Sequence, residues 1–329
     1  MLDKLEKFSG YFDTKIEGFL KEKDEIPNLN DGVLYSISTK GKRIRPFLCY
    51  EVCKILNGDT EIVLPFAAAM EIMHSWILIH DDIEDGDTVR RNKPAVWIKY
   101  GIPHGINIGD YLQNKVYKII INTRTSGIGD RIILKILNLV SQTLIYTTQG
   151  QALDMNLRID NNPTIDKYIT SVNLKAGYYL SCPIITGAIV AGAGDDLLNT
   201  INNYGQCIGP AFQIRDDLID LTVGKGRNNI IGNDVREGKR TLLVIHALEN
   251  SSPDEKIKLL NILNKKREQN TQEEIDWIIK LFRKHNSIEF AENYAKELLN
   301  QAEKEITELP EDLKIFLIEI AAFMIERKI

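Results

Sequence analysis

The chain has 329 residues, of which 43% are hydrophobic and 26% are charged, so it can bury a substantial core in one large or two modest domains. The net charge of −5 argues against a generic nucleic-acid binder. The four cysteines show neither CxxC spacing nor an accompanying histidine cluster, which argues against a zinc site and for a reducing compartment, the cytoplasm. The strongest apolar stretch noted, 183–194, is too short for a transmembrane segment.

Apolar residues recur at helical spacing along the chain from its first residue onward, and convincing alternating strand patterns are absent. The first 24 residues place apolar side chains at near-helical spacing between charges, which indicates a docking helix of the fold and no signal or transit peptide. Further helices are expected at 32–38, 46–56, 63–85, 105–121, 129–157 and 164–191, with a kink at Pro183, and one or two helices are expected over 195–221.

The second half continues with a glycine-rich, charged segment, 222–240, which is typical of a loop that closes over something rather than packing under it. From Thr241 onward, short amphipathic helices alternate with charged turns. No low-complexity linker or clear repeat divides the chain. We therefore predict one all-α domain over residues 1–329, with about a dozen helices around a central cavity.

The most informative stretch is His80-Asp81-Asp82-Ile83-Glu84-Asp85, at the end of the helix expected over 63–85. At about 100° per residue, Asp81 and Asp85 lie one turn apart on one helix face, with Asp82 beside them. Carboxylates so close repel one another unless cations sit between them. Taken alone, a charged stripe of this kind is usually a solvated helix face.

The pattern recurs later in the chain, where Asp216, Asp217 and Asp220 again end an apolar helical run. Carboxylate oxygens are the ligands that Mg²⁺ prefers, and phosphate oxygens usually complete its shell. Arg90 and Arg91, just beyond the first triplet, offer planar forks suited to phosphate. Together these features imply a diphosphate substrate clamped between the two triplets.

Six motifs in order resemble those of the trans-isoprenyl diphosphate synthases, most closely the archaeal-type geranylgeranyl diphosphate synthases. The motifs are Gly41-Lys42-Arg43-Ile44-Arg45-Pro46, Glu71-Ile72-Met73-His74, the stretch from His80 to Arg91, Gly150-Gln151-Ala152-Leu153-Asp154, Lys175-Ala176-Gly177, and Phe212 to Asp220 followed by Gly232 to Thr241. The resemblance implies the all-α isoprenoid synthase fold with its central apolar cavity, and a homodimer.

The resemblance also implies a reaction, the joining of isopentenyl diphosphate to an allylic diphosphate of five to fifteen carbons with loss of pyrophosphate. Several Mg²⁺ ions would assist departure of the pyrophosphate. The metal ligands would be Asp81, Asp85 and Asp216. Asp82, Asp217 and Asp220 would hold the metals directly or through water, Lys175, Lys239 and Arg90 would add positive charge, and Gln213 would contact the allylic end.

By the same resemblance, the second substrate has a metal-free diphosphate site that holds its double bond within reach of the cation. Its residues would be Lys42, Arg45, His74 and Arg91. Considered singly, these are ordinary surface charges and a core histidine. Only their joint order relative to the triplets, supplied by the resemblance, favours a function.

Product length in this family depends on side chains just before the first aspartate. Trp76 and Ile77 occupy those positions, and the helical wheel places Ile77 near Asp81, Met73 further round and Trp76 furthest. Trp76 is therefore either a tunnel floor or a residue packed against a neighbouring helix. A single aromatic at this position is typical of C20 synthases, so geranylgeranyl diphosphate is the first expectation, with farnesyl or geranylfarnesyl diphosphate next.

Four positions depart from the family pattern: Lys40, Asn92, Trp97 and Ala176. Lys40 and Asn92 replace glycines, and asparagine tolerates positive φ better than most residues. Trp97 stands where a histidine is common, and Ala176 replaces a threonine whose hydroxyl could contact phosphate. These changes concern affinity and local loop shape rather than reaction type.

Two alternatives remain open. A class I terpene cyclase also ionises diphosphates on Mg²⁺, but it normally carries a different second motif and has no need for the Lys42 and His74 site. A non-catalytic regulatory subunit of a heteromeric synthase could lose its aspartates without penalty, and this chain keeps them.

Overall fold

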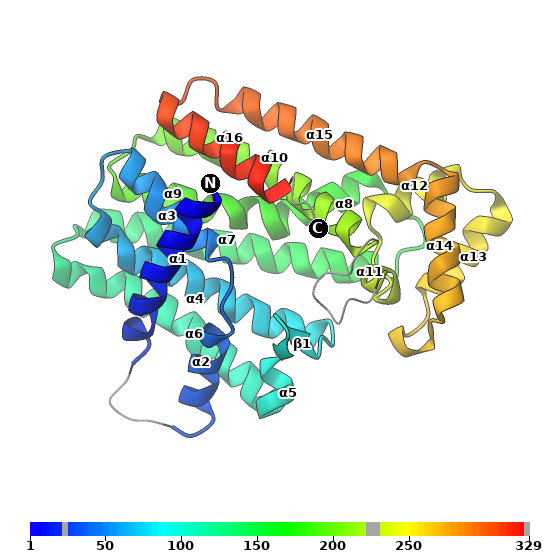
Figure 1. The fold of residues 1–329 in the computed structure, drawn as a ribbon, viewed down its shortest axis with the longest axis horizontal. Coiled ribbons are helices and arrows are strands. Elements are labelled where there is room, and N and C mark those ends of the chain that lie inside the picture. The colour runs from blue at the N-terminus through cyan, green and yellow to red at the C-terminus, as the bar shows by residue number, and fades with distance from the viewer. Residues whose placement is uncertain (22–25, 222–230, 326–329) are drawn as a thin grey trace. The chain divides into compact units, whose positions relative to one another are not determined.

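The computed structural model describes residues 1–21, 26–221 and 231–325, which fold almost entirely into α-helices (Figure 1). The predicted all-α fold is confirmed. Contacts divide the chain into two compact units. Unit 1 consists of Met1–Ser141, Cys182–Asn199 and Pro310–Phe316; unit 2 consists of Gln142–Ser181, Thr200–Leu309 and Leu317–Ile329. The single domain over 1–329 stays a prediction.

The elements follow one another along the described chain with short connections. They are α1 (Leu2–Ile16), α2 (Leu29–Ser38), α3 (Ile44–Ile55), α4 (Thr60–Glu84), β1 (Val89–Arg90), β2 (Lys93–Pro94), α5 (Val96–Tyr100), α6 (Ile102–Asn122), α7 (Asp130–Leu157), α8 (Ile165–Val172), α9 (Tyr178–Val190), α10 (Asp195–Asp220), α11 (Asn233–Arg236), α12 (Leu242–Asn250), α13 (Pro253–Leu263), α14 (Gln272–Lys284), α15 (Ser287–Glu305) and α16 (Glu311–Ile325). Short 3₁₀ turns cover Glu17–Phe19, Thr123–Ser126 and Arg267–Gln269, and a π-helical turn covers Asn173–Gly177.

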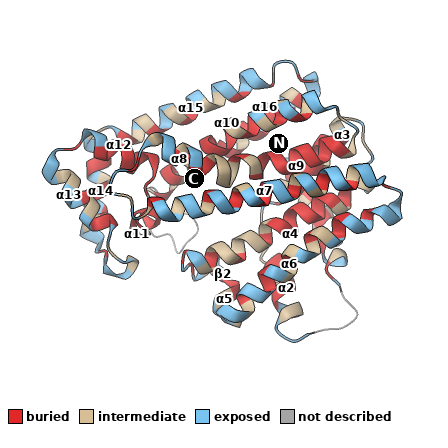
Figure 2. Ribbon diagram, turned by 180° about the vertical axis from the view of Figure 1, so that it is seen from behind, coloured by how far each residue is buried: buried red, intermediate tan, exposed pale blue. Residues whose placement is uncertain are grey.

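Unit 1 is built around α4, which packs against α6 and α3. Its buried side chains, from Val63 to Asp82, lie on several faces, as expected for a helix enclosed by others (Figure 2). The helix begins at Thr60, earlier than predicted, because the Asp59 side chain accepts hydrogen bonds from the amides of Glu61 and Ile62 at 2.8 and 3.3 Å. This cap fixes the start of the helix whose far end carries the first triplet.

Within the described part of the chain, α4 alone is long and apolar enough to cross a membrane by length and composition. Over its most apolar window the mean hydropathy is 1.8, and 67% of that window is buried inside the protein. The prediction that 183–194 is the strongest apolar stretch is therefore wrong. Uninterrupted apolar runs do not detect α4, because that helix contains occasional polar residues.

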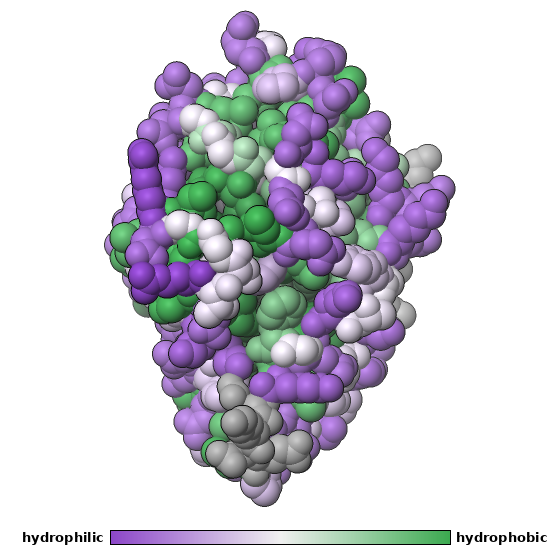
Figure 3. Space-filling view, turned by 90° about the vertical axis from the view of Figure 1, so that its left-hand side faces the viewer, coloured by the Kyte–Doolittle hydropathy of each residue, from purple (hydrophilic) through white to green (hydrophobic). Residues whose placement is uncertain are grey.

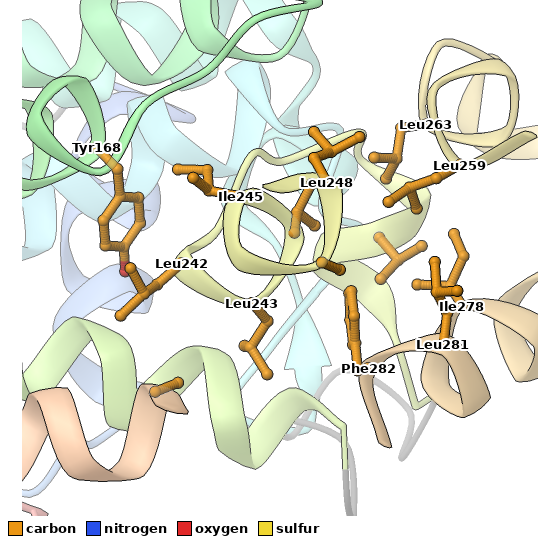
Figure 4. Packing of buried hydrophobic residues seen from close by; sticks show 14 of the residues in the cluster. Tyr168, Leu242, Leu243, Ile245, Leu248, Leu259, Leu263, Ile278, Leu281 and Phe282 are labelled. Atoms are coloured by element: carbon orange, nitrogen blue, oxygen red, sulfur yellow. The ribbon is translucent and has the colours of Figure 1, made fainter. Parts of the chain in front are cut away.

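Unit 2 has a separate apolar cluster centred on α12, which contacts α15, α14 and α8. The helix starts where the Thr241 hydroxyl accepts a hydrogen bond from the Val244 amide, at 3.5 Å. Figure 4 shows Leu242 and Ile245 near Tyr168, and Leu281 and Phe282 further along the same cluster. This cluster therefore supports Tyr168, whose hydroxyl belongs to the candidate site.

Three predicted segments differ in the structure. The helix expected over 164–191 is interrupted at Asn173–Gly177, ahead of Pro183, which lies inside α9. The polar stretch after α4 contains a hairpin in which β1 pairs antiparallel with β2. Of the loop expected over 222–240, residues 222–230 lie outside the described residues, while the remainder forms α11 and buries Asn233 and Asp234, so that part packs into the unit.

The surface mixes polar and apolar side chains. Figure 3 shows one face on which apolar atoms gather in the upper half and hydrophilic side chains surround them. Among the described residues, exposed large apolar side chains include Ile102, Ile106 and Ile121 of α6 and Leu134 of α7.

Candidate active site

The first triplet lies at the end of α4, where Asp82 is buried and held by an arginine. Arg90 Nε donates to Asp82 Oδ1 at 2.8 Å, and its Nη2 also contacts that oxygen. The same Nη2 lies 3.4 Å from Asp87 and 3.8 Å from Asp81. Burial raises the pKa of Asp82 to about 6, and the charge of Arg90 opposes this rise. Arg90 therefore acts as the counter-charge of the first triplet.

The hairpin after α4 directs the two consecutive arginines to different places. Arg91 and Asn92 form its turn with φ of 53° and 60°, the positive values that a tight hairpin turn of this twist requires. Asn92 thus keeps the turn in place of a glycine, as predicted. Arg90 reaches Asp82, whereas Arg91 lies 3.5 Å from the Thr39 hydroxyl, beyond the end of α2. Trp97 supports this region because its indole N–H donates to the Asp87 carbonyl at 2.8 Å.

Arg91 belongs to a group of basic side chains in unit 1 that also contains Arg45 and His74, which we call the Arg–His group. Arg45 Nη1 lies 3.2 Å from His74 Nε2, so that this ring nitrogen is the acceptor. Burial lowers the pKa of His74 well below its usual value, and the charges of Arg45, Arg91, Arg90 and Arg43 add to the effect. A neutral histidine between arginines can still contact a phosphate oxygen. Lys42 is exposed on the adjoining turn.

Gly41 allows Arg91 to approach that turn. A Cβ added at Gly41 would lie 2.4 Å from Arg91 Nη2 and 2.5 Å from its Cζ. Lys40, which stands where the family has a glycine, adopts φ of 47°, a conformation that glycine would accept with less strain. Of the four residues predicted for the metal-free diphosphate site, the structure thus brings Arg45, His74 and Arg91 together, with Lys42 beside them.

In unit 2, two neutral side chains donate hydrogen bonds to the second triplet. The Tyr168 hydroxyl donates to Asp217 Oδ2 at 2.8 Å, and the Gln213 amide donates to Oδ1 at 2.8 Å. Burial raises the pKa of Tyr168, and the charge of Asp217 raises it further, so the hydroxyl keeps its proton. Asp216 is half-buried on the same turn. The contact of Gln213 with the allylic substrate stays a prediction.

Asp220 ties the segment after the second triplet to α10. Its Oδ2 accepts a hydrogen bond from the Asp234 amide at 3.0 Å, and its carbonyl accepts one from the Gly232 amide at 2.9 Å. Lys239 lies 2.9 Å from Asp234 and 2.7 Å from Glu237. These contacts place Lys239 beside Tyr168, Lys175 and Asp217 in the lining of one small cavity.

Lys175 sits on the π-helical turn Asn173–Gly177, a feature often found at functional sites. Its ammonium lies 3.6 Å from Asp154, which also pairs with Arg158 at 3.1 Å. The turn packs against α7 where Gly150 lacks a side chain, because a Cβ there would lie 2.3 Å from the Lys175 nitrogen. On the opposite side, a Cβ at Gly209 would lie 2.4 Å from Gly177 Cα.

The candidate chain-length residues lie on α4. The Trp76 indole donates to His80 Nδ1 at 3.2 Å. The His80 ring packs against α6 at Gly109, where an added Cβ would lie 2.2 Å from its Nε2. Met73 is fully buried and Ile77 is half-buried. The roles of Met73, Trp76 and Ile77 in chain length stay predictions.

Several residues that contact the two sites were not predicted from the sequence. Tyr168 shares a helix face with Lys175 at α-helical spacing, which was the available signal. Glu71 appeared in a motif without a role, although a buried acid one turn before His74 implies a buried cation nearby. Asp154 and Asp234 also lie within these motifs, and no function was predicted for either residue. The meeting of the two triplets on one diphosphate stays a prediction, since each triplet is described within its own unit.

The donor atoms suit a hard cation. Within residues 1–21, 26–221 and 231–325, no group of three or more histidine, cysteine or acidic side chains is arranged to hold a metal alone. Mg²⁺ usually takes one or two carboxylates and completes its shell with phosphate and water. Asp81 has a side chain that is 20% exposed at the end of α4, which suits such partial protein coordination.

Comparisons with known proteins agree with this architecture. The polyprenyl synthetase family model matches residues 26–282. The short chain isoprenyl diphosphate synthase of Methanocaldococcus jannaschii is 34% identical over 85% of this chain and 82% of its own. The geranylgeranyl diphosphate synthase of Saccharolobus solfataricus is 32% identical over 95% and 94%. The crystal structure of geranylgeranyl pyrophosphate synthetase from Pyrococcus horikoshii superposes with a TM-score of 0.88 at 28% identity, covering 99% and 98% of the two chains. The chain belongs to the polyprenyl synthetase family.

Proposed function

We propose that the protein joins isopentenyl diphosphate to an allylic diphosphate with loss of pyrophosphate. One observation carries the proposal: unit 1 contains the Arg–His group in addition to the carboxylates around Arg90. A prenyltransferase binds two diphosphates and needs both kinds of site. A class I cyclase ionises one diphosphate and has no use for the Arg–His group.

In this reaction the allylic C–O bond breaks, and the double bond of isopentenyl diphosphate attacks the resulting carbocation to form the new C–C bond. The released pyrophosphate takes the proton that the product loses. Arg45, His74 and Arg91 would orient the second substrate, which makes the step effectively unimolecular. Arg90, Lys175 and Lys239 would stabilise the departing anion. Apolar walls would exclude water from the cation.

Magnesium is part of the proposal. Asp81, Asp85 and Asp216 would hold it, and Asp82 and Asp217 would orient their neighbours through the contacts described above. When bound, the metal supplies Lewis-acid stabilisation of the leaving diphosphate.

The test is product analysis with labelled isopentenyl diphosphate and starters of five, ten and fifteen carbons, with and without Mg²⁺. Elongated diphosphates formed only with Mg²⁺ are expected. Asp216→Asn should abolish them, whereas Asp196→Asn, an exposed aspartate at the start of the same helix, should not. Cyclised hydrocarbon from farnesyl diphosphate alone would favour a cyclase. No turnover, with stimulation of an added synthase, would favour a regulatory subunit.

The proposed product is geranylgeranyl diphosphate. Replacing Trp76 by alanine should lengthen the products, because removing the indole enlarges the space next to α4 into which the chain would grow. Chromatography of the dephosphorylated products measures this. Trp277→Ala, which removes an indole of α14 that contacts Lys258, is the control and should leave the distribution unchanged. An unchanged distribution for Trp76→Ala would assign that residue to packing alone.

The assembly and location are also proposed. A homodimer would cover the exposed side chains of Ile102, Ile106, Ile121 and Leu134, and light scattering after gel filtration would measure its mass. A cytoplasmic location is supported by the four free cysteines, three of which are buried.

A further inference from the structure

A buried arginine lies next to the Arg–His group without belonging to it. The Arg43 side chain is only 2% exposed, and each of its nitrogens has a partner from a different helix. Nε donates to Asp13 of α1 at 2.9 Å, Nη1 to Glu71 of α4 at 2.6 Å, and Nη2 to the carbonyl of Ile37 in α2 at 2.9 Å. Three helices are thus joined through one side chain that no substrate can reach.

Arg43 is also where the chain reverses into α3. It caps that helix with φ of 51°, and Lys40 in the same turn has φ of 47°. Residues with side chains keep such conformations only where the surrounding structure holds them. The turn carries Lys42 and leads directly to Arg45, and it receives Arg91 against Gly41. The ion pairs of Arg43 help to fix this turn from inside the unit.

The negative charge of Glu71 stabilises the positive charges of the same region. Its side chain is 2% exposed, and it lies one helical turn before His74. Glu71 raises the pKa of Arg43 against the lowering effect of burial, and it likewise favours the charged form of Arg91. One buried carboxylate thus balances part of the repulsion between arginines that a diphosphate site requires close together.

We propose that Arg43 and Glu71 are positioning residues for the second diphosphate: their buried ion pair sets the spacing of Lys42, Arg45 and Arg91 without touching the substrate. This inference rests on the proposed function and names two residues that set affinity at its metal-free site.

The double variant Arg43→Met with Glu71→Leu tests the positioning role. It should change the positions of the diphosphate-binding side chains without changing the net charge of the region or the stability of the fold. It removes one positive and one negative charge, so the net charge of the region is unchanged. Apolar residues of similar volume often replace a buried ion pair without loss of stability. The contacts to Asp13 and the Ile37 carbonyl are lost, so the turn is no longer fixed. We expect the KM for isopentenyl diphosphate to rise about tenfold, while kcat and the KM for the allylic diphosphate stay within about twofold.

The control variant is Lys135→Met with Asp195→Asn, which removes an exposed ion pair of the same unit and should change neither KM. An unchanged KM for isopentenyl diphosphate in a folded double variant would overturn the proposal. If the double variant does not fold, Asp13→Ala provides the test, since this aspartate is 25% exposed and contributes one of the three contacts, and alanine has no oxygen to accept the hydrogen bond from Arg43. A selective rise in the same KM supports the proposal and no rise overturns it. Failure of the wild-type protein to elongate any starter would instead contradict the proposed function.

Discussion

The two aspartate triplets have the same spacing and end similar helices, but the protein holds them by different means. In unit 1, the guanidinium of Arg90 donates hydrogen bonds to Asp82. In unit 2, a phenol and an amide hold Asp217 through neutral hydrogen bonds. The donor to Asp82 is charged, whereas these two donors to Asp217 are neutral. A repeated motif therefore need not imply a repeated environment.

This difference predicts unequal sensitivity to substitution, and Arg90→Gln should have the largest effect. It removes the charge that opposes the rise in the pKa of Asp82 and one cation proposed to face the diphosphate. Stabilising donors of this kind contribute about 100- to 1000-fold to kcat. Steady-state kinetics would measure the loss, with Arg124→Gln, an arginine of an exposed pair, as control. A variant within about threefold of wild type would contradict the charge-dependent account.

Tyr168→Phe should have a smaller effect. It removes one hydrogen bond to a carboxylate, a change of about 1.5–3 kcal/mol, and leaves the ring packed as in Figure 4. We expect about a tenfold loss of kcat. Tyr204→Phe is a matched control in the same unit, because it deletes a buried hydroxyl that donates to the Leu317 carbonyl at 2.8 Å. Equal losses of activity in the two variants would show that the Asp217 contact has no special role.

The smallest effect is expected for His74→Gln, and it concerns the free energy of unfolding. The substitution should change how this stability depends on pH below neutrality. Because the pKa of His74 is lowered in the folded protein, the unfolded chain binds a proton that the folded chain does not. Below the unfolded pKa near 6.5, wild-type stability therefore falls as pH falls. Glutamine does not titrate, so the variant should lose about 1 kcal/mol less than wild type between pH 7.5 and 5.5. Urea unfolding at both values tests this, with His104→Gln of α6 as control, and equal losses would contradict it.

Periodicity and composition were enough to predict the helical class and most helix cores, because apolar residues at helical spacing determine which face is buried. The ends depended on side-chain caps such as Asp59, which a residue pattern locates only approximately. The reaction class came from ordered motifs. The partners of those motifs could not be predicted. The resemblance selects Arg45 for the diphosphate site, but the residue pattern does not show that Arg43 is buried against Asp13 and Glu71, because that depends on the left-handed backbone conformation of Arg43.

The π-helical turn that carries Lys175 contains one residue more than an α-helical turn would need. Removing a residue there would let α8 and α9 join as one regular helix, and the cost in backbone hydrogen bonding would be small. Because the π-helical turn already absorbs the extra residue, α8 and α9 would keep their present faces. The deletion would change only the turn itself, so Lys175 would be lost or turned away from its present neighbours while the apolar face of α9 stayed in place. A shortened relative could thus remain folded while losing the lysine proposed to stabilise the departing anion, which offers a simple route from an active synthase to an inactive paralogue.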